Sequence, residues 1–107
     1  MIFYDTLDGM LAYYKRVAES TQRDQKTVLD RAQANAFAHI IGVLSQDGIS
    51  ETLSYCWEQV LRLRTWLSEH NEEETGYTYR FWAESVYWRF LVRYTTITDD
   101  ISYMDEE

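Results

Sequence analysis

Few side chains in this sequence have the types and spacing that catalysis or metal binding requires. His70 stands beside Glu72, Glu73 and Glu74, and a cluster of imidazole and carboxylates can bind a divalent metal. The sequence lacks, however, the His-x-x-x-His and Glu-x-x-His spacings that place such ligands on one helix face. His39 lies on the flank of an apolar helical stripe, a position typical of a hydrogen-bonded edge residue. We therefore predict no metal site.

The single cysteine and the four glycines form no catalytic or phosphate-binding motif. Cys56 lies on an apolar helical stripe, and no base is spaced to activate it, so we interpret it as a small core side chain. The glycines are isolated, whereas a phosphate-binding loop needs several close together. Glu69 and Glu72 resemble the carboxylate pairs with which all-α nucleotide pyrophosphatases hold magnesium. Those enzymes need a second acidic pair on a neighbouring helix, and here the next helix has only Glu84. We predict a protein without enzymatic activity or cofactor.

Length and composition are those of an ordinary soluble domain. The 107 residues suffice for one domain with its own core, and 46% hydrophobic and 26% charged residues are typical values. Charges interrupt every apolar run, so we expect no membrane span. The first residues have no basic region ahead of an apolar one, and a single cysteine excludes an internal disulfide. We expect a cytoplasmic protein.

The net charge of −8 is concentrated in the last third of the chain. Residues 67–107 contain ten acids and three bases, which gives −7 for this part. Such a surface repels phosphate, so we expect no direct binding to nucleic acid. The acidic surface that we predict consists of Glu69, Glu72, Glu73, Glu74, Asp99 and Asp100.

Apolar residues recur at three- and four-residue steps over four segments, and the chain has no proline. This pattern predicts helices over about residues 5–19, 24–45, 51–70 and 77–98, with Gln46-Asp47-Gly48 ending the second. We therefore expect an all-α fold, a small antiparallel bundle of about four helices. The helical domain is expected to span residues 1–98, followed by an acidic tail over residues 99–107.

The last of these helices has two apolar faces when it is wound at about 100° per residue. One face carries Tyr77, Phe81, Trp88 and Val92. The other face carries Tyr79, Ala83, Val86, Tyr87, Phe90 and Tyr94. A helix that is apolar on two faces needs two covers, and the second could come from its own chain, from another copy or from a different protein.

An alternative secondary structure exists for parts of this segment. Residues 77–81 alternate between aromatic and polar, and residues 92–98 are rich in β-branched side chains, so both could be strands. The residues between Ala83 and Arg89 include no Gly, Pro, Asn or Asp for a hairpin turn. We therefore prefer the helix.

Aromatic and arginine side chains also lie away from the predicted core stripes. Tyr, Trp and Arg are the residue types enriched at interface hot spots. We predict that these side chains bind another protein, and that the chain acts as a small acidic inhibitor or regulator by occupying that partner. The predicted binding residues are Tyr55, Arg62 and Trp66 in one cluster, and Trp82, Arg89 and Arg93 in a second.

In size, acidity and lack of motifs, the chain is similar in class to small phage-encoded inhibitors of bacterial defence, such as anti-CRISPR and antirestriction proteins. This similarity implies a nucleic-acid-binding partner whose basic groove the acids would occupy as phosphate mimics. A solvated acidic surface is the plainer interpretation.

Two other functions stay open at this stage. One is a structural homodimer or small-assembly subunit, which the doubly apolar helix favours. A strip of small residues, Ala34, Ala38 and Gly42, would favour it too, although we expect that strip to face solvent. The other is a small helical enzyme or ligand carrier with the aromatic helix as a pocket wall.

Overall fold

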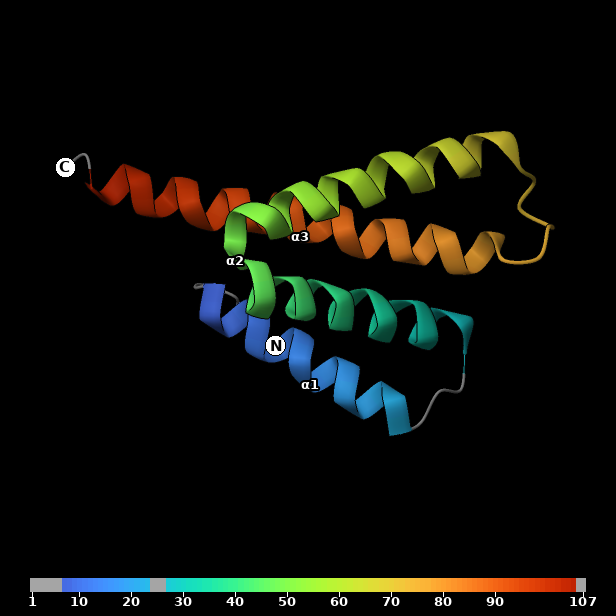
Figure 1. Ribbon diagram of the computed structural model, residues 1–107, viewed down its shortest axis with the longest axis horizontal. Coiled ribbons are helices and arrows are strands. Elements are labelled where there is room, and N and C mark those ends of the chain that lie inside the picture. Colours follow the sequence, from blue (N-terminus) through green and yellow to red (C-terminus); the bar gives the residue numbers. More distant parts are fainter. Residues whose placement is uncertain (1–6, 24–26, 106–107) are drawn as a thin grey trace.

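The computed structural model describes residues 7–23 and 27–105, with side chains described for 8–19 and 27–95, and the regular secondary structure of these residues is all α-helical (Figure 1). Its three helices are α1 (Leu7–Arg23), α2 (Val28–Glu69) and α3 (Tyr77–Asp105). The all-α class is confirmed, and residues 77–81 and 92–98 are helical rather than strands. The helix starts expected near residues 5 and 24 lie outside the described residues.

The structure has three helices where we expected about four, because α2 runs through the second and third expected segments and joins them across a kink at Gly48. The chain reverses direction inside α2 at one residue (Figure 1). Gly48 has φ 85° and ψ 179°, a backbone conformation that only glycine adopts readily. The Thr52 hydroxyl, fully buried, donates a hydrogen bond to the Gly48 carbonyl over 2.7 Å. A one-residue bend thus replaces the expected end of the second helix at Gln46-Asp47-Gly48.

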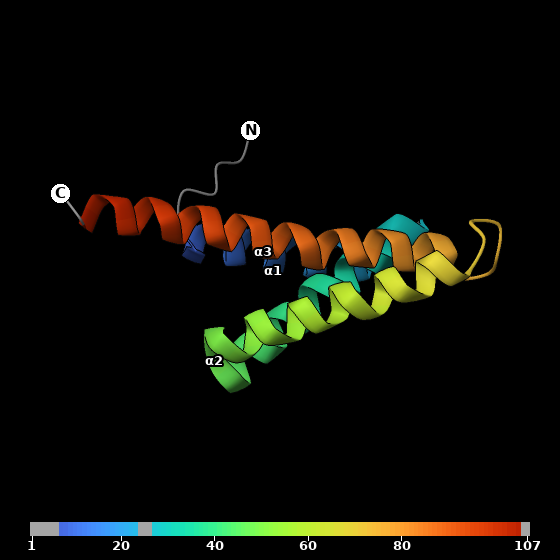
Figure 2. The same ribbon diagram turned by 90° about the horizontal axis from the view of Figure 1, so that it is seen from above.

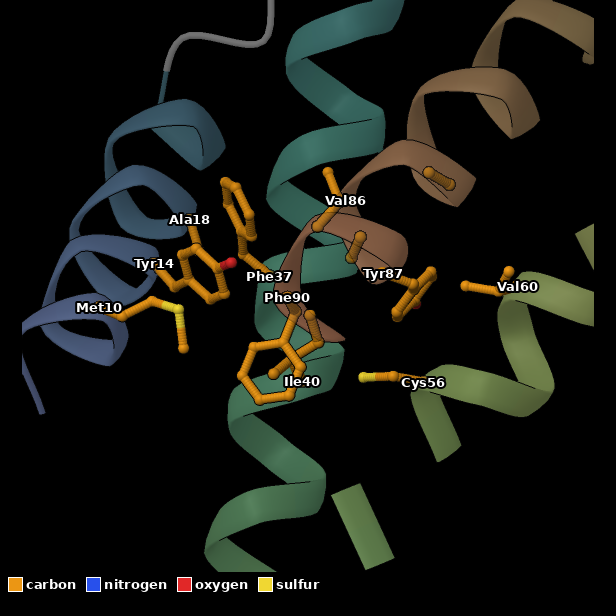
Figure 3. Close-up of a cluster of buried hydrophobic side chains, with 12 residues drawn as sticks. Met10, Tyr14, Ala18, Phe37, Ile40, Cys56, Val60, Val86, Tyr87 and Phe90 are labelled. Atoms are coloured by element: carbon orange, nitrogen blue, oxygen red, sulfur yellow. The ribbon is translucent and has the colours of Figure 1, made fainter. Parts of the chain in front are cut away.

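The first half of α2 is the central element of the fold, with α1 on one side and α3 on the other (Figures 1 and 3). Thr27 caps its start, since the Thr27 hydroxyl accepts a hydrogen bond from the Asp30 N–H over 3.0 Å. Because two helices cover it, Ala34 is buried and Ala38 is half-buried. The expectation that these small residues face solvent is therefore wrong for Ala34, and Gly42 is the exposed member of the strip.

One hydrophobic core joins all the helical segments (Figure 3). The rings of Tyr14 on α1 and Phe37 on α2 are stacked with centroids 4.3 Å apart, and Phe90 on α3 lies 6.1 Å from Tyr14. The largest fully buried side chains are Met10, Ile40, Thr52, Cys56, Val60, Val86 and Phe90.

The third helix is longer than the sequence predicts. It continues through residues 99–105, which we had assigned to a tail. Both views show its C-terminal end extending beyond α1 and beyond the bend of α2 (Figures 1 and 2). No helix in the described part of the chain is long and apolar enough to cross a membrane.

Candidate protein-binding surface

The two apolar faces of α3 have different surroundings. Ala83, Val86, Tyr87 and Phe90 face the core and are buried. On the opposite face Phe81 and Val92 are each 46% exposed, and Trp88 is 38% exposed. The described part of the chain therefore buries one apolar face of this helix and leaves the other partly exposed to solvent.

The second half of α2 adds to this exposed face. Trp57 and Leu61, one helical turn apart, are 47% and 49% exposed. The Trp57 and Trp88 rings lie side by side with centroids 6.2 Å apart. The surface so formed, called here the apolar stripe, consists of Trp57, Leu61, Phe81, Trp88 and Val92.

An ion pair next to the apolar stripe links α2 to α3. The Arg64 Nε donates a hydrogen bond to Glu84 Oε1 over 2.9 Å, and Glu84 is largely buried. The same guanidinium lies 4.7 Å from the Trp88 ring centroid, in cation–π geometry. The Arg64 guanidinium thus holds the Trp88 indole by one ring face before any partner binds, which lowers the entropic cost of binding.

Two open hollows adjoin the apolar stripe. One has a volume of about 470 Å³ and is lined by Trp57, Trp88, Leu91, Val92 and Thr95. The other has a volume of about 450 Å³ and lies among the three helices; Tyr13, Phe37, Arg89 and Arg93 are in its wall, and it shares Trp88 and Val92 with the first. Trp88 and Val92 therefore separate the two hollows, and Trp57 lies on the other wall of the first, a shape with which the side chains of a partner can interdigitate.

Burial raises the pKa of two titratable groups of the core. Burial raises the pKa of the Cys56 thiol to about 12, so this thiol stays protonated and unreactive near neutral pH. Burial, chiefly, also raises the pKa of the Tyr87 hydroxyl, which lies in hydrogen-bond contact with His39 Nδ1 at 3.2 Å. Among the described residues, no three His, Cys, Asp or Glu side chains are grouped for metal binding.

The first predicted binding cluster is not brought together as an exposed patch. Tyr55 is half-buried against the core, with its ring edge-on to Tyr87 at 5.9 Å. Trp66 is half-buried between neighbours: its ring stacks on His70 at 3.8 Å, and the Arg80 guanidinium lies 4.2 Å from it. The expectation of an outward-facing cluster is therefore corrected for Tyr55 and Trp66. Arg62 alone is exposed, in an ion pair with Glu58 at 3.2 Å.

The second predicted cluster is brought together in part. Arg89 and Arg93 are exposed and line the same hollow, one turn apart on α3. Trp82 is half-buried, with its ring edge-on to Phe81 at 5.3 Å. The arginines thus lie next to the apolar stripe, on the side of α3 that faces α1.

The predicted acidic residues are in two places. Glu69, Glu72, Glu73 and Glu74 are exposed where α2 leads into α3, and Glu74 Oε1 accepts a hydrogen bond from the Asn71 N–H over 3.3 Å. Asp99 and Asp100 belong to the helical backbone of α3, but their side chains lie outside the described ones.

Sequence reasoning missed the α2 half of the apolar stripe. Helical periodicity places Trp57 beside Cys56 on the same apolar stripe and so predicts a core position for it, and it does not single out Leu61. The sequence does not show how wide a sector of this helix the core covers. Cys56 and Val60 are fully buried, whereas Trp57 and Leu61, the residues directly after them, are half exposed. The α3 half did have a signal, namely the two apolar faces.

Comparisons with models of known families, with curated proteins and with solved structures give no match to this chain.

Proposed function

We propose that this protein is a non-enzymatic protein-binding module that occupies another protein with its apolar stripe. The observation that carries the proposal is the exposure of two tryptophans, Trp57 and Trp88, side by side on two helices that a core holds in place. Monomeric soluble proteins scatter single apolar residues over their surfaces, but they rarely gather large ones.

The residue types support a protein partner. An aromatic side chain buries about 150–250 Å² when it is fully covered, and tryptophan is the commonest anchor of interface hot spots. An anchor of this kind typically costs about 2 kcal/mol or more of binding free energy when it is truncated. Trp57 and Trp88, with Leu61, Phe81 and Val92 around them, therefore provide side chains of the kinds that anchor protein interfaces.

The charge supports a particular class of partner. The net charge of −8 and the exposed glutamates at the end of the α2–α3 pair favour a basic surface, such as the groove of a nucleic-acid-binding protein. The role would be that of a small inhibitor or regulator, similar in class to phage-encoded inhibitors of bacterial defence. In this arrangement the apolar stripe supplies affinity and the acids supply orientation.

Affinity capture from a lysate of the source cells, with matched variants as bait, tests the proposal. A stripe variant with Trp57→Ser and Leu61→Ser should remain folded and lose the captured protein. A control variant with Glu51→Ser should retain it. If the stripe variant retains the same proteins as the wild type, the apolar stripe is not the binding surface.

The same capture experiment also tests whether the exposed glutamates contribute to partner binding. A variant with Glu72, Glu73 and Glu74 changed to lysine should capture less of the partner, and added salt should weaken wild-type capture, since exposed charges are screened over about 8–10 Å. Capture that is indifferent to both treatments would leave the stripe proposal intact and limit these acids to solubility.

A further inference from the structure

We propose that two copies of this chain form a two-fold dimer through their apolar stripes. The proposal rests on the surface of the proposed function and deepens it, because it names what covers the stripe when no other protein is bound. A second copy and a different partner would then compete for one surface, so self-association would regulate partner binding.

The first observation is the apolar area that the stripe exposes. Each of its five side chains is between 38% and 49% exposed. From the size of such side chains, complete cover by a second copy would bury roughly 500 Å² of them in each copy. An interface of standard size buries about 800 Å² per partner. The apolar stripe therefore supplies more than half of the area that a stable dimer needs, and exposed polar side chains beside it can supply the rest.

The second observation is the charge around the stripe. The chain has a net charge of −8, but residues 57–68 and 77–92, which carry the stripe, contain four bases and two acids and sum to +2. The exposed glutamates 69 and 72–74 lie beyond these segments, at one end. Because like charges repel, two copies of an acidic chain repel least where these segments meet.

Two charged pairs beside the stripe are already formed within one copy. Arg64 is paired with Glu84 at 2.9 Å, and Arg62 is paired with Glu58 at 3.2 Å. Burying an unpaired charge is strongly unfavourable, whereas a pair that is already formed carries its opposite charge with it. A second copy that covers these pairs therefore leaves none of the four charges without a partner.

The stripe has a bulky side chain on one side of its tryptophan pair and a hollow on the other. Phe81 lies two turns from Trp88, or about 10 Å, toward the loop that joins α2 to α3. Thr95 lies two turns from Trp88 in the opposite direction. Thr95, Val92 and Trp57 line the hollow of about 470 Å³. The two features thus lie at similar distances from the tryptophan pair, in opposite directions along α3.

A two-fold axis brings these two features together twice. The axis lies in the plane of contact, at right angles to α3 and level with Trp57 and Trp88. It places Phe81 of each copy over Val92 and Thr95 of the other, so each hollow receives a ring. The second half of α2 and α3 lie side by side and are joined at one end (Figures 1 and 2), so this axis also directs the two glutamate-rich loops to opposite ends of the dimer. Reciprocal contacts of this kind are those of a two-fold homodimer.

Sedimentation equilibrium and native mass spectrometry test the dimer with a matched pair of variants. Leu61→Glu places a carboxylate within the contact, and Ser45→Glu adds the same charge at an exposed position outside the stripe. The wild type and Ser45→Glu should be dimeric at micromolar concentration. Leu61→Glu should raise the dissociation constant at least about thirtyfold, which corresponds to the loss of one interface anchor. Added salt should strengthen the wild-type dimer, because it screens the repulsion between two chains of net charge −8.

Disulfide crosslinking tests the two-fold register. A mixture of Phe81→Cys and Thr95→Cys should give a crosslinked dimer under mild oxidation, because these positions face each other across the contact. Each variant alone should give none, since its two introduced thiols lie about 20 Å apart along the helices. Cys56 is buried and stays out of the reaction. Crosslinking within either variant alone, or none in the mixture, overturns this register.

Thermal unfolding shows whether each variant is folded, and Phe81→Ser replaces Leu61→Glu if the latter is not. A wild type that stays monomeric from micromolar to millimolar concentration overturns the dimer, and so does a dimer that Leu61→Glu leaves intact. A monomeric wild type whose capture of a partner still depends on Trp57 overturns the dimer alone and leaves the proposed function standing. Loss of the dimer without loss of capture in the stripe variant would support the dimer and overturn the proposed function.

Discussion

The two faces of α3 differ less in composition than in what covers them. The inner face, with Val86, Tyr87 and Phe90, packs against both halves of α2 and is buried. The outer face, with Trp88 and Val92, is as apolar but stays exposed beside the second half of α2. An apolar helix face in a sequence thus indicates that the face needs to be covered. It leaves open whether the same chain or another molecule covers it. In our account the inner face stabilises the fold and the outer face binds protein.

The largest expected effect is the difference in unfolding free energy between truncating a residue of the inner face and truncating one of the outer face. Phe90→Ala removes a fully buried ring and should cost about 3–5 kcal/mol of unfolding free energy. This is a large share of the roughly 5–15 kcal/mol of a typical domain. Trp88→Ala, on the outer face, should cost about 1 kcal/mol, mainly through its contact with Arg64. Urea denaturation of both variants measures the contrast, and equal losses would mean that the outer face is also core.

A smaller effect should follow from altering the bend that places the second half of α2 beside α3. Gly48→Ala forces a side chain into a strained conformation, φ 85° and ψ 179°, and should cost about 1–3 kcal/mol. Gly42→Ala is the matched control: it lies inside a helix with no atom within 4 Å of the new methyl group, and should stabilise the protein by about 0.5–1 kcal/mol. Thermal unfolding distinguishes the two signs. A stabilising Gly48→Ala would show that α2 does not need this bend.

The smallest of the three effects concerns a tryptophan of α2 that α3 does cover. Trp66 is half-buried against His70 and Arg80, so Trp66→Ala should lower the unfolding free energy by about 1–2 kcal/mol. Trp57→Ala, at a position on the same helix that is 47% exposed, should lower it by less. Chemical denaturation of the two variants gives the ranking. A reversed ranking would mean that Trp57 is buried in solution and is no part of an open surface.

The sequence predicts the helices well, because the three- and four-residue periodicity and the lack of proline are local signals. It does not predict the helix count, because the expected loop at Gln46-Asp47-Gly48 is a bend at one residue. Glycine at that position indicates a helix end but not how soon the next helix begins. The periodicity also did not identify the cap of α2, which begins at Val28 after the Thr27 hydroxyl accepts a hydrogen bond from the Asp30 N–H.

The candidate site is predictable only in part, for a physical reason. A helical projection gives the angle of each side chain around its own axis, so the two faces of α3 could be recognised. It says nothing of the neighbouring helices, and these determine exposure. Trp66 projects away from the core stripe of its helix and is still covered by Arg80 of α3, whereas Trp57 projects toward the core and is half exposed.

Site-specific photo-crosslinking in the source cells tests the central claim, that the apolar stripe binds protein, most directly. A benzoyl-phenylalanine replaces Trp57 in one variant and the exposed polar residue Ser45 in a control, and adducts are resolved by mass after irradiation. We predict a discrete protein adduct from position 57 and none from position 45. Position 57 yielding no adduct, or the same adducts as position 45, would contradict the account.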